Sequence, residues 1–115
     1  LRSGKTDASV SQFRSIVARD AKTIEALTNL ALGLKSSDRS DEAREMLQRA
    51  LGINGKYAPA HHNLALIYEE TVDLVRAIEH YEQYLVLAGA ENAALTSEIR
   101  GRVQTLQAKL IPKLD

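Results

Sequence analysis

The chain has 115 residues, the size of one ordinary domain, and its 15 Lys and Arg residues balance its 15 Asp and Glu residues. Zero net charge argues against a nucleic-acid partner, because binding to a polyanion requires a surplus of Lys and Arg. Apolar residues make up 44% of the chain, which excludes a disordered protein, and no apolar run reaches the ~18 residues of a membrane span.

Apolar residues recur three and four positions apart along the chain, which is the spacing of amphipathic helices. Short polar segments separate the helices, and helices joined in this way pack as antiparallel neighbours. Ser40 can cap the second helix, and Pro59 fits the first turn of the third. The sequence therefore predicts an all-α fold. Its apolar stripes are Leu27, Leu30, Ala31 and Leu34; Ala43, Met46, Leu47, Ala50 and Leu51; Leu64, Ala65 and Tyr68; and Ile78, Tyr81 and Leu85.

The chain also resembles itself at an offset of 34 residues. Between residues 24–57 and 58–91 this offset aligns nine identical residues, against about two expected by chance for a window of this length and an ordinary composition. The sequence therefore contains a tandem repeat of a helix pair. The identical pairs are Ala26 and Ala60, Asn29 and Asn63, Leu30 and Leu64, Ala31 and Ala65, Leu32 and Leu66, Ala43 and Ala77, Glu45 and Glu79, Leu51 and Leu85, and Gly55 and Gly89.

The repeat resembles the tetratricopeptide repeat family, whose unit is a helix-turn-helix of about 34 residues. In that family the first helix carries a large residue, a Leu followed by a small residue, and an aromatic residue or Leu. Its second helix carries a small, a bulky and a second small residue. The matching residues are Leu27, Leu30, Ala31, Leu34, Ala43, Leu47 and Ala50, then His61, Leu64, Ala65, Tyr68, Ala77, Tyr81 and Tyr84. The sequence departs from the family at His61, at Tyr84, and at Gly55 and Gly89, where Pro is usual.

The resemblance implies a single domain over residues 1–115, an all-α, right-handed solenoid of helix-turn-helix repeats. Residues 6–19 are expected to form the second helix of a partial repeat, and 24–57 and 58–91 two full repeats. Residues 92–111 are expected to form a C-terminal capping helix with one apolar and one polar face. Because the chain begins at Leu1 without a signal-peptide pattern, we expect it to be part of a longer protein.

No residue pattern indicates catalysis, a cofactor or a metal site. Gly4-Lys5-Thr6 matches only the end of a phosphate-binding loop, and the earlier Gly of that loop is missing. His61 and His62 point about 100° apart on a helix, so they cannot share one metal ion. Without Cys the chain has no disulfide, thiolate metal site or cysteine nucleophile, and its compartment stays open between cytoplasm and periplasm.

The resemblance implies a protein-interaction module, a scaffold or adaptor that binds a peptide or protein segment along the concave face of its first helices. Asn29 and Asn63 would form hydrogen bonds with the partner. Leu32 and Leu66 would supply apolar contact. Glu69 and Glu70, without counter-ions on their own helix, would favour a partner carrying Lys or Arg. The residues expected on this face are Glu25, Thr28, Asn29, Leu32, Lys35, His62, Asn63, Leu66, Glu69 and Glu70.

Two alternatives come from other functional classes. The chain could self-associate as a homo-oligomer, because residues 6–19 have no first helix to cover their apolar side chains, which are Val10, Phe13, Ile16 and Val17. An RNA-binding helical repeat is less favoured, since such repeats run one residue longer and usually carry net positive charge.

Overall fold

The computed structural model describes the backbone of residues 2–89 and 91–111, and the side chains of these residues other than 2–14, 16 and 17. This part of the chain consists of five helices and contains no strand. The predicted all-α helix-turn-helix fold is therefore confirmed. The helices are α1 (Arg2–Ser36), α2 (Ser40–Ile53), α3 (Ala58–Glu70), α4 (Leu74–Ala88) and α5 (Ala93–Leu110).

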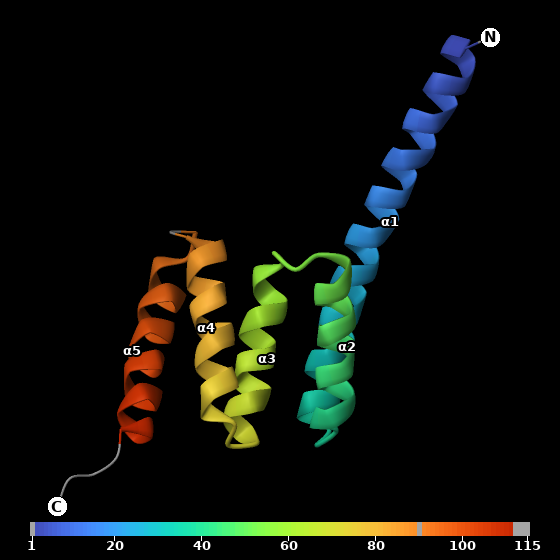
Figure 1. Ribbon diagram of the computed structural model, residues 1–115. Coiled ribbons are helices and arrows are strands. Elements are labelled where there is room, and N and C mark those ends of the chain that lie inside the picture. The colour runs from blue at the N-terminus through green and yellow to red at the C-terminus, as the bar shows by residue number, and fades with distance from the viewer. Residues whose placement is uncertain (1, 90, 112–115) are drawn as a thin grey trace, which may run out of the picture.

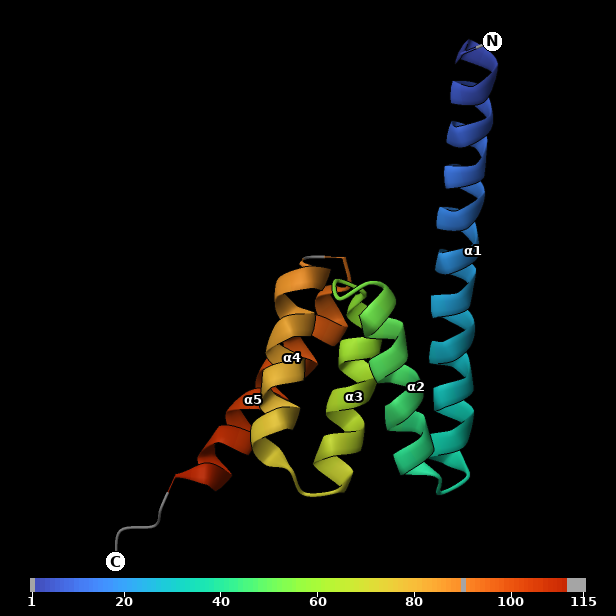
Figure 2. The same ribbon diagram turned by 45° about the vertical axis from the view of Figure 1, so that its right-hand side comes forward.

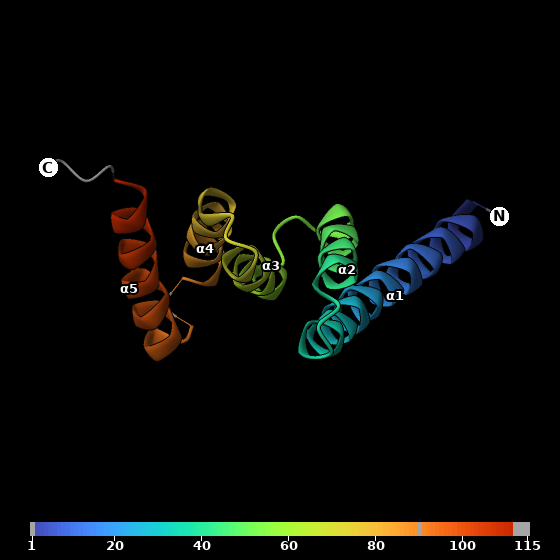
Figure 3. The ribbon, with the colours of Figure 1, turned by 90° about the horizontal axis from the view of Figure 1, so that it is seen from below.

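The helices stack side by side in chain order, each antiparallel to the one before it (Figure 1). The N-terminal part of α1 extends well past the end of α2 (Figure 2), which makes the molecule 77 Å long. Seen along the helices, α2 and α4 lie on one side of the stack and α1 and α3 on the other (Figure 3). No helix among the described residues has the length and apolar character needed to cross a membrane.

Small residues lie where paired helices meet, and large residues fill the space beside them. Ala43 and Ala50 on α2, and Ala77 on α4, are fully buried. Leu47 and Tyr81, at the bulky position of each second helix, are fully buried as well. Short side chains allow close approach of two helix axes, and the bulky residue restores the packing density of the core.

Both helix pairs turn through the same backbone motif. At the end of α3, Asp73 N–H donates to the Tyr68 carbonyl at 2.8 Å, and Val72 N–H donates to the Glu69 carbonyl at 3.1 Å. These two hydrogen bonds define a Schellman motif, whose C′ residue adopts left-handed backbone and is usually Gly. Here that residue is Val72, with φ of 61° and a side chain that is 75% exposed. A β-branched residue is strained in this conformation.

Replacing Val72 by Gly is expected to raise the free energy of unfolding by about 1 kcal/mol, because Gly relieves the left-handed strain and no buried contact is lost. Asp38 occupies the same position of the α1–α2 turn, with φ of 63°. Since Asp tolerates this conformation better than Val, Asp38→Gly should stabilise the chain less. Urea denaturation of both variants measures the difference, and a destabilised Val72→Gly variant would contradict the assignment.

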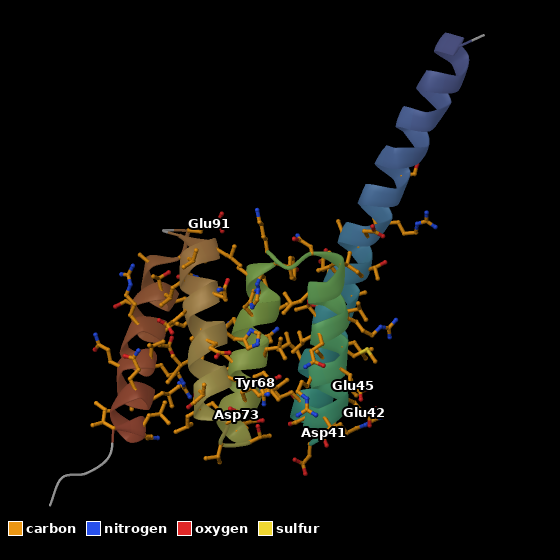
Figure 4. The ribbon with its side chains drawn as sticks, in the orientation of Figure 1. Asp41, Glu42, Glu45, Tyr68, Asp73 and Glu91 are labelled. Carbon is orange, nitrogen blue, oxygen red and sulfur yellow. The ribbon has the colours of Figure 1, made fainter. Side chains whose placement is uncertain are left out.

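The first turn of α2 differs from the sequence prediction. Ser40 is the first helical residue rather than the N-cap, and Arg39 at the N-cap makes no capping hydrogen bond through its side chain. Acidic side chains support this helix end instead, because negative charge near an N-terminus interacts favourably with the helix dipole. Asp41 and Glu42 lie in the first turn, and Figure 4 shows them with Glu45 at this end of α2.

The largest difference from prediction lies in α1. Residues 6–19 do not form a separate helix, because helix α1 runs without interruption from Arg2 to Ser36. The connecting residues 20–23 contain neither Gly nor Pro, so the local sequence provides no helix terminator. Leu30, predicted in the core, is 52% exposed. The residues considered for self-association, Val10, Phe13, Ile16 and Val17, lie outside the described side chains.

Candidate functional site

A cavity of about 200 Å³ lies on the side of the stack formed by α1, α3 and α5. Its lining comes from all three helices, namely Lys35, Leu66, Glu69, Glu70 and Arg102. Four of these residues are expected from the sequence, and Arg102 is not. Through Lys35 and Glu70 the cavity borders a second one of about 570 Å³, which reaches the α1–α2 turn. The two cavities adjoin at Lys35 and Glu70, and Leu66 is the apolar residue in the lining of the smaller one.

Glu69 connects three helices through its carboxylate. Arg102 on α5 donates to it through Nε at 2.7 Å and Nη2 at 3.1 Å, and the Tyr81 hydroxyl on α4 donates at 2.8 Å. The hydrogen bonds from Arg102 hold the pKa of Glu69 below its usual value, despite partial burial. Burial, and then the Glu69 carboxylate, raise the pKa of Tyr81. This arrangement keeps Glu69 ionised and Tyr81 protonated at neutral pH.

Glu70 also has a counter-ion. Lys35 Nζ on α1 lies 3.0 Å from the Glu70 carboxylate, and the Ser40 hydroxyl donates to the same group at 3.5 Å. The expectation of two uncompensated carboxylates is therefore wrong. Lys35 on α1 pairs with Glu70, and Arg102 on α5 pairs with Glu69. Neither cation lies close in sequence to the carboxylate that it pairs with.

Two residues expected on the binding face are buried. The Thr28 hydroxyl donates to the Ile24 carbonyl at 2.8 Å within α1, so its hydrogen-bonding capacity is used inside the helix. Asn63 on α3 is buried as well. Asn29 is exposed although it aligns with the buried Asn63. The 34-residue offset alone therefore does not predict which of the two is buried. The other candidates are exposed or half-buried, namely Glu25, Asn29, Leu32, Lys35, His62, Leu66, Glu69 and Glu70.

Sequence reasoning also missed a histidine pair that joins α3 to α4. His61 Nε2 lies 2.8 Å from the Gly55 carbonyl, which can only accept, so this nitrogen donates the hydrogen bond. His61 Nδ1 is hydrogen-bonded to His80 Nδ1 at 2.9 Å. The His80 ring also stacks on Tyr68, with ring centroids 5.6 Å apart. The two histidines are 19 positions apart, and only the packing of α4 on α3 brings them together.

Acid is expected to destabilise the chain through His80. Burial, and then the nearby His61, lower the pKa of His80 from 6.5 to about 4. The folded state therefore binds this proton less readily than the unfolded state, so stability is complete above pH 6.5 and is lost as the pH falls toward 4. Allowing for water around the half-buried ring, we expect a loss of about 1 kcal/mol at pH 5.

Thermal unfolding between pH 7.5 and 5 measures this loss. His80→Asn should flatten the pH dependence in part, while His62, whose pKa is also lowered by burial, keeps a residual slope. An unchanged pH profile in His80→Asn would contradict the assignment. Within the described part of the chain, no three His, Asp, Glu or Cys side chains form a group that could hold a metal ion.

Comparison with known proteins relates one helix pair of this chain to a known repeat. The family model of the tetratricopeptide repeat matches residues 24–57. The chain is 33% identical over 57 residues to the Oryza sativa subsp. japonica protein named probable UDP-N-acetylglucosamine–peptide N-acetylglucosaminyltransferase SPINDLY, a match that covers 50% of this chain and 6% of that protein. It is 33% identical over 60 residues to the uncharacterized protein ycf37 of Porphyra purpurea, which covers 52% of this chain and 35% of that protein.

The chain spans about a third of the ycf37 relative and a much smaller share of the SPINDLY relative. The glycosyltransferase activity in the rice protein's name is therefore not assigned to this chain. The family match covers the helix pair formed by the end of α1 and by α2, and the aligned pair α3–α4 repeats its architecture. The match identifies residues 24–57 as a tetratricopeptide repeat, and the α3–α4 pair has the same helix-turn-helix arrangement.

Proposed function

We propose that the chain is a non-catalytic scaffold or adaptor module that binds a peptide or protein segment on the face formed by α1, α3 and α5. The tetratricopeptide repeat is in general a protein-interaction module, which supports the broad class. The observation that carries the proposal is the cavity of about 200 Å³ to which all three helices contribute. A hollow with one apolar and several polar side chains suits a partner segment that inserts one apolar residue.

The ion pairs change the chemistry expected of the partner. Glu69 is paired with Arg102 and Glu70 with Lys35, so the cavity carries no net charge and does not select a basic segment. Affinity would come from apolar contact with Leu66 and with Leu32, which is exposed on α1, and from hydrogen bonds to Asn29. Because the charges of the cavity are paired, they steer a charged partner only weakly, and binding should depend only weakly on salt.

Selection of binding peptides from a displayed library against the chain tests this proposal. Peptides selected on the unmodified chain should bind Leu32→Asp at least ~10-fold more weakly, because the substitution places a charge on the apolar contact. The matched control is Val86→Asp on α4, whose side chain is 77% exposed on another helix layer. Equal effects of the two substitutions, or backbone amide shifts confined to α2 and α4, would contradict the proposed face.

A further inference from the structure

Equivalent positions of the two helix pairs differ in burial. Ala60 and Leu64 on α3 are 0% exposed, whereas Ala26 is exposed on α1 and Leu30 is 52% exposed. The residue types are identical at the 34-residue offset, so side-chain chemistry does not explain the difference. Helix α3 packs against α2, the second helix of the preceding pair, as well as against α4, whereas no described helix precedes α1. On α1 the equivalent face is open to solvent at Leu30.

The repeat register identifies the segment that would cover this face. Helix α2 corresponds, 34 residues earlier, to residues 6–19. Phe13 aligns with Leu47, the fully buried residue at the bulky position of α2. Val17 aligns with Leu51, which packs partly buried against the core. The segment that corresponds to α2 therefore carries apolar residues at the required positions.

The connection between this segment and Leu30 can adopt the α2–α3 turn. Residues 20–23 align with Asn54, Gly55, Lys56 and Tyr57. In that turn the Asn54 side chain accepts a hydrogen bond from the Lys56 N–H at 3.0 Å. Asp20 aligns with Asn54 and Lys22 with Lys56, and an Asp carboxylate accepts the same bond.

The remaining turn positions fit as well. Gly55 does not use left-handed backbone, and a Cβ there would meet only the Leu51 carbonyl oxygen, at an ordinary 3.7 Å. Ala21 can therefore take its place without strain. Thr23 aligns with Tyr57, the N-cap of α3, which makes no capping hydrogen bond through its side chain. Thr is a better N-cap than Tyr, so it favours a helix that begins at Ile24.

We propose that α1 has a second conformation, in which it opens at residues 20–23 and residues 6–19 fold back onto the Ala26–Leu30 face of the same chain. The segment then takes the place that α2 takes on α3, and a third antiparallel helix is added to the start of the stack. The continuous helix keeps the backbone hydrogen bonds of residues 20–23, whereas the folded-back form buries Leu30. None of the residues that line the α1–α3–α5 cavity lies in the segment that moves or in the Ala26–Leu30 face. Asn29 does lie in that face, so the folded-back form would bury it as Asn63 is buried on α3 and would remove its contribution to the proposed binding face.

A disulfide between residues 13 and 30 distinguishes the two conformations. In the continuous helix the two Cα atoms are about 25 Å apart, at 1.5 Å per residue, and a disulfide requires Cα atoms within about 7 Å. The chain has no Cys of its own, so the variant with Phe13→Cys and Leu30→Cys contains only these two thiols. We expect mild oxidation at low protein concentration to give an intramolecular disulfide in a monomer.

The matched control is Ser15→Cys with Leu32→Cys, which has the same separation in sequence. Ser15 aligns with Arg49, an exposed residue of α2, so the folded-back form leaves this pair apart and no disulfide should form. Absence of the disulfide between positions 13 and 30 would overturn the proposal. Covalent dimers from that pair would also overturn it, because they would make a second copy of the chain the partner of the Leu30 face.

Distances between two spin labels measure how much of the continuous and of the folded-back conformation is populated. Unlike a disulfide, the labels do not trap the rarer conformation. Labels at residues 9 and 36, both within α1, would be about 40 Å apart along the continuous helix. In the folded-back form they would lie across two packed helices with axes about 8–10 Å apart. Ala21→Gly should increase the short-distance population, because Gly weakens the continuous helix. Asp20→Ala should decrease it by removing the turn acceptor. A single long distance in all three proteins would overturn the proposal.

Discussion

Replacing Glu69 by Ala is expected to lower the free energy of unfolding by about 1–3 kcal/mol. Its carboxylate accepts hydrogen bonds from the Tyr81 hydroxyl and from Arg102, and Tyr81 is fully buried. Without Glu69 the buried hydroxyl loses its acceptor and α5 loses its ion pair with α3. Urea denaturation at pH 7 measures the change.

Glu70→Ala is the control for this experiment. The Glu70 side chain is 50% exposed against 23% for Glu69, so its ion pair with Lys35 should contribute less than about 1 kcal/mol. The pH dependence adds a second readout. Because the pKa of Glu69 is lowered in the folded state, its contribution is complete above pH 4.5 and is lost as the pH falls below that value. Equal losses in the two variants would contradict the role assigned to Glu69.

Enlarging Ala77 to Leu is expected to lower the free energy of unfolding by about 1–3 kcal/mol through overpacking. Ala77 is fully buried on α4, in the helix pair that α4 forms with α3, and the close approach of the two helices leaves no room for extra methyl groups. Thermal unfolding measures the effect. Ala94→Leu, at an exposed position of α5, should leave the melting temperature within about a degree of the parent chain.

An unchanged melting temperature in Ala77→Leu would contradict the helix register, because that register puts Ala77 at the small-residue position of the second helix. The same register puts Ala43 at the equivalent position of α2, where it is also fully buried. The two positions should therefore respond alike.

Periodicity and the 34-residue offset were sufficient to predict the helix pairs, because helix formation and pairing depend on local spacing and on short connections. The buried positions Ala43, Leu47, Ala77 and Tyr81 follow from the same register. Leu30 shows the limit of this reasoning. Leu30 is 52% exposed although the identical residue at the equivalent position, Leu64, is fully buried. Burial at this position therefore depends on which helices pack around it, and a repeat register does not specify that.

The ion pairs on the proposed binding face could not be predicted from the sequence either. The sequence by itself determined the all-α repeat, the candidate helices of the face and the presence of Leu32, Lys35 and Leu66 on them. Only the tertiary structure decided that Arg102 neutralises Glu69 and that His61 meets His80, since these contacts join α3 to α5 and to α4. Pairing between side chains depends on how helices stack, and a distance in sequence does not specify that geometry.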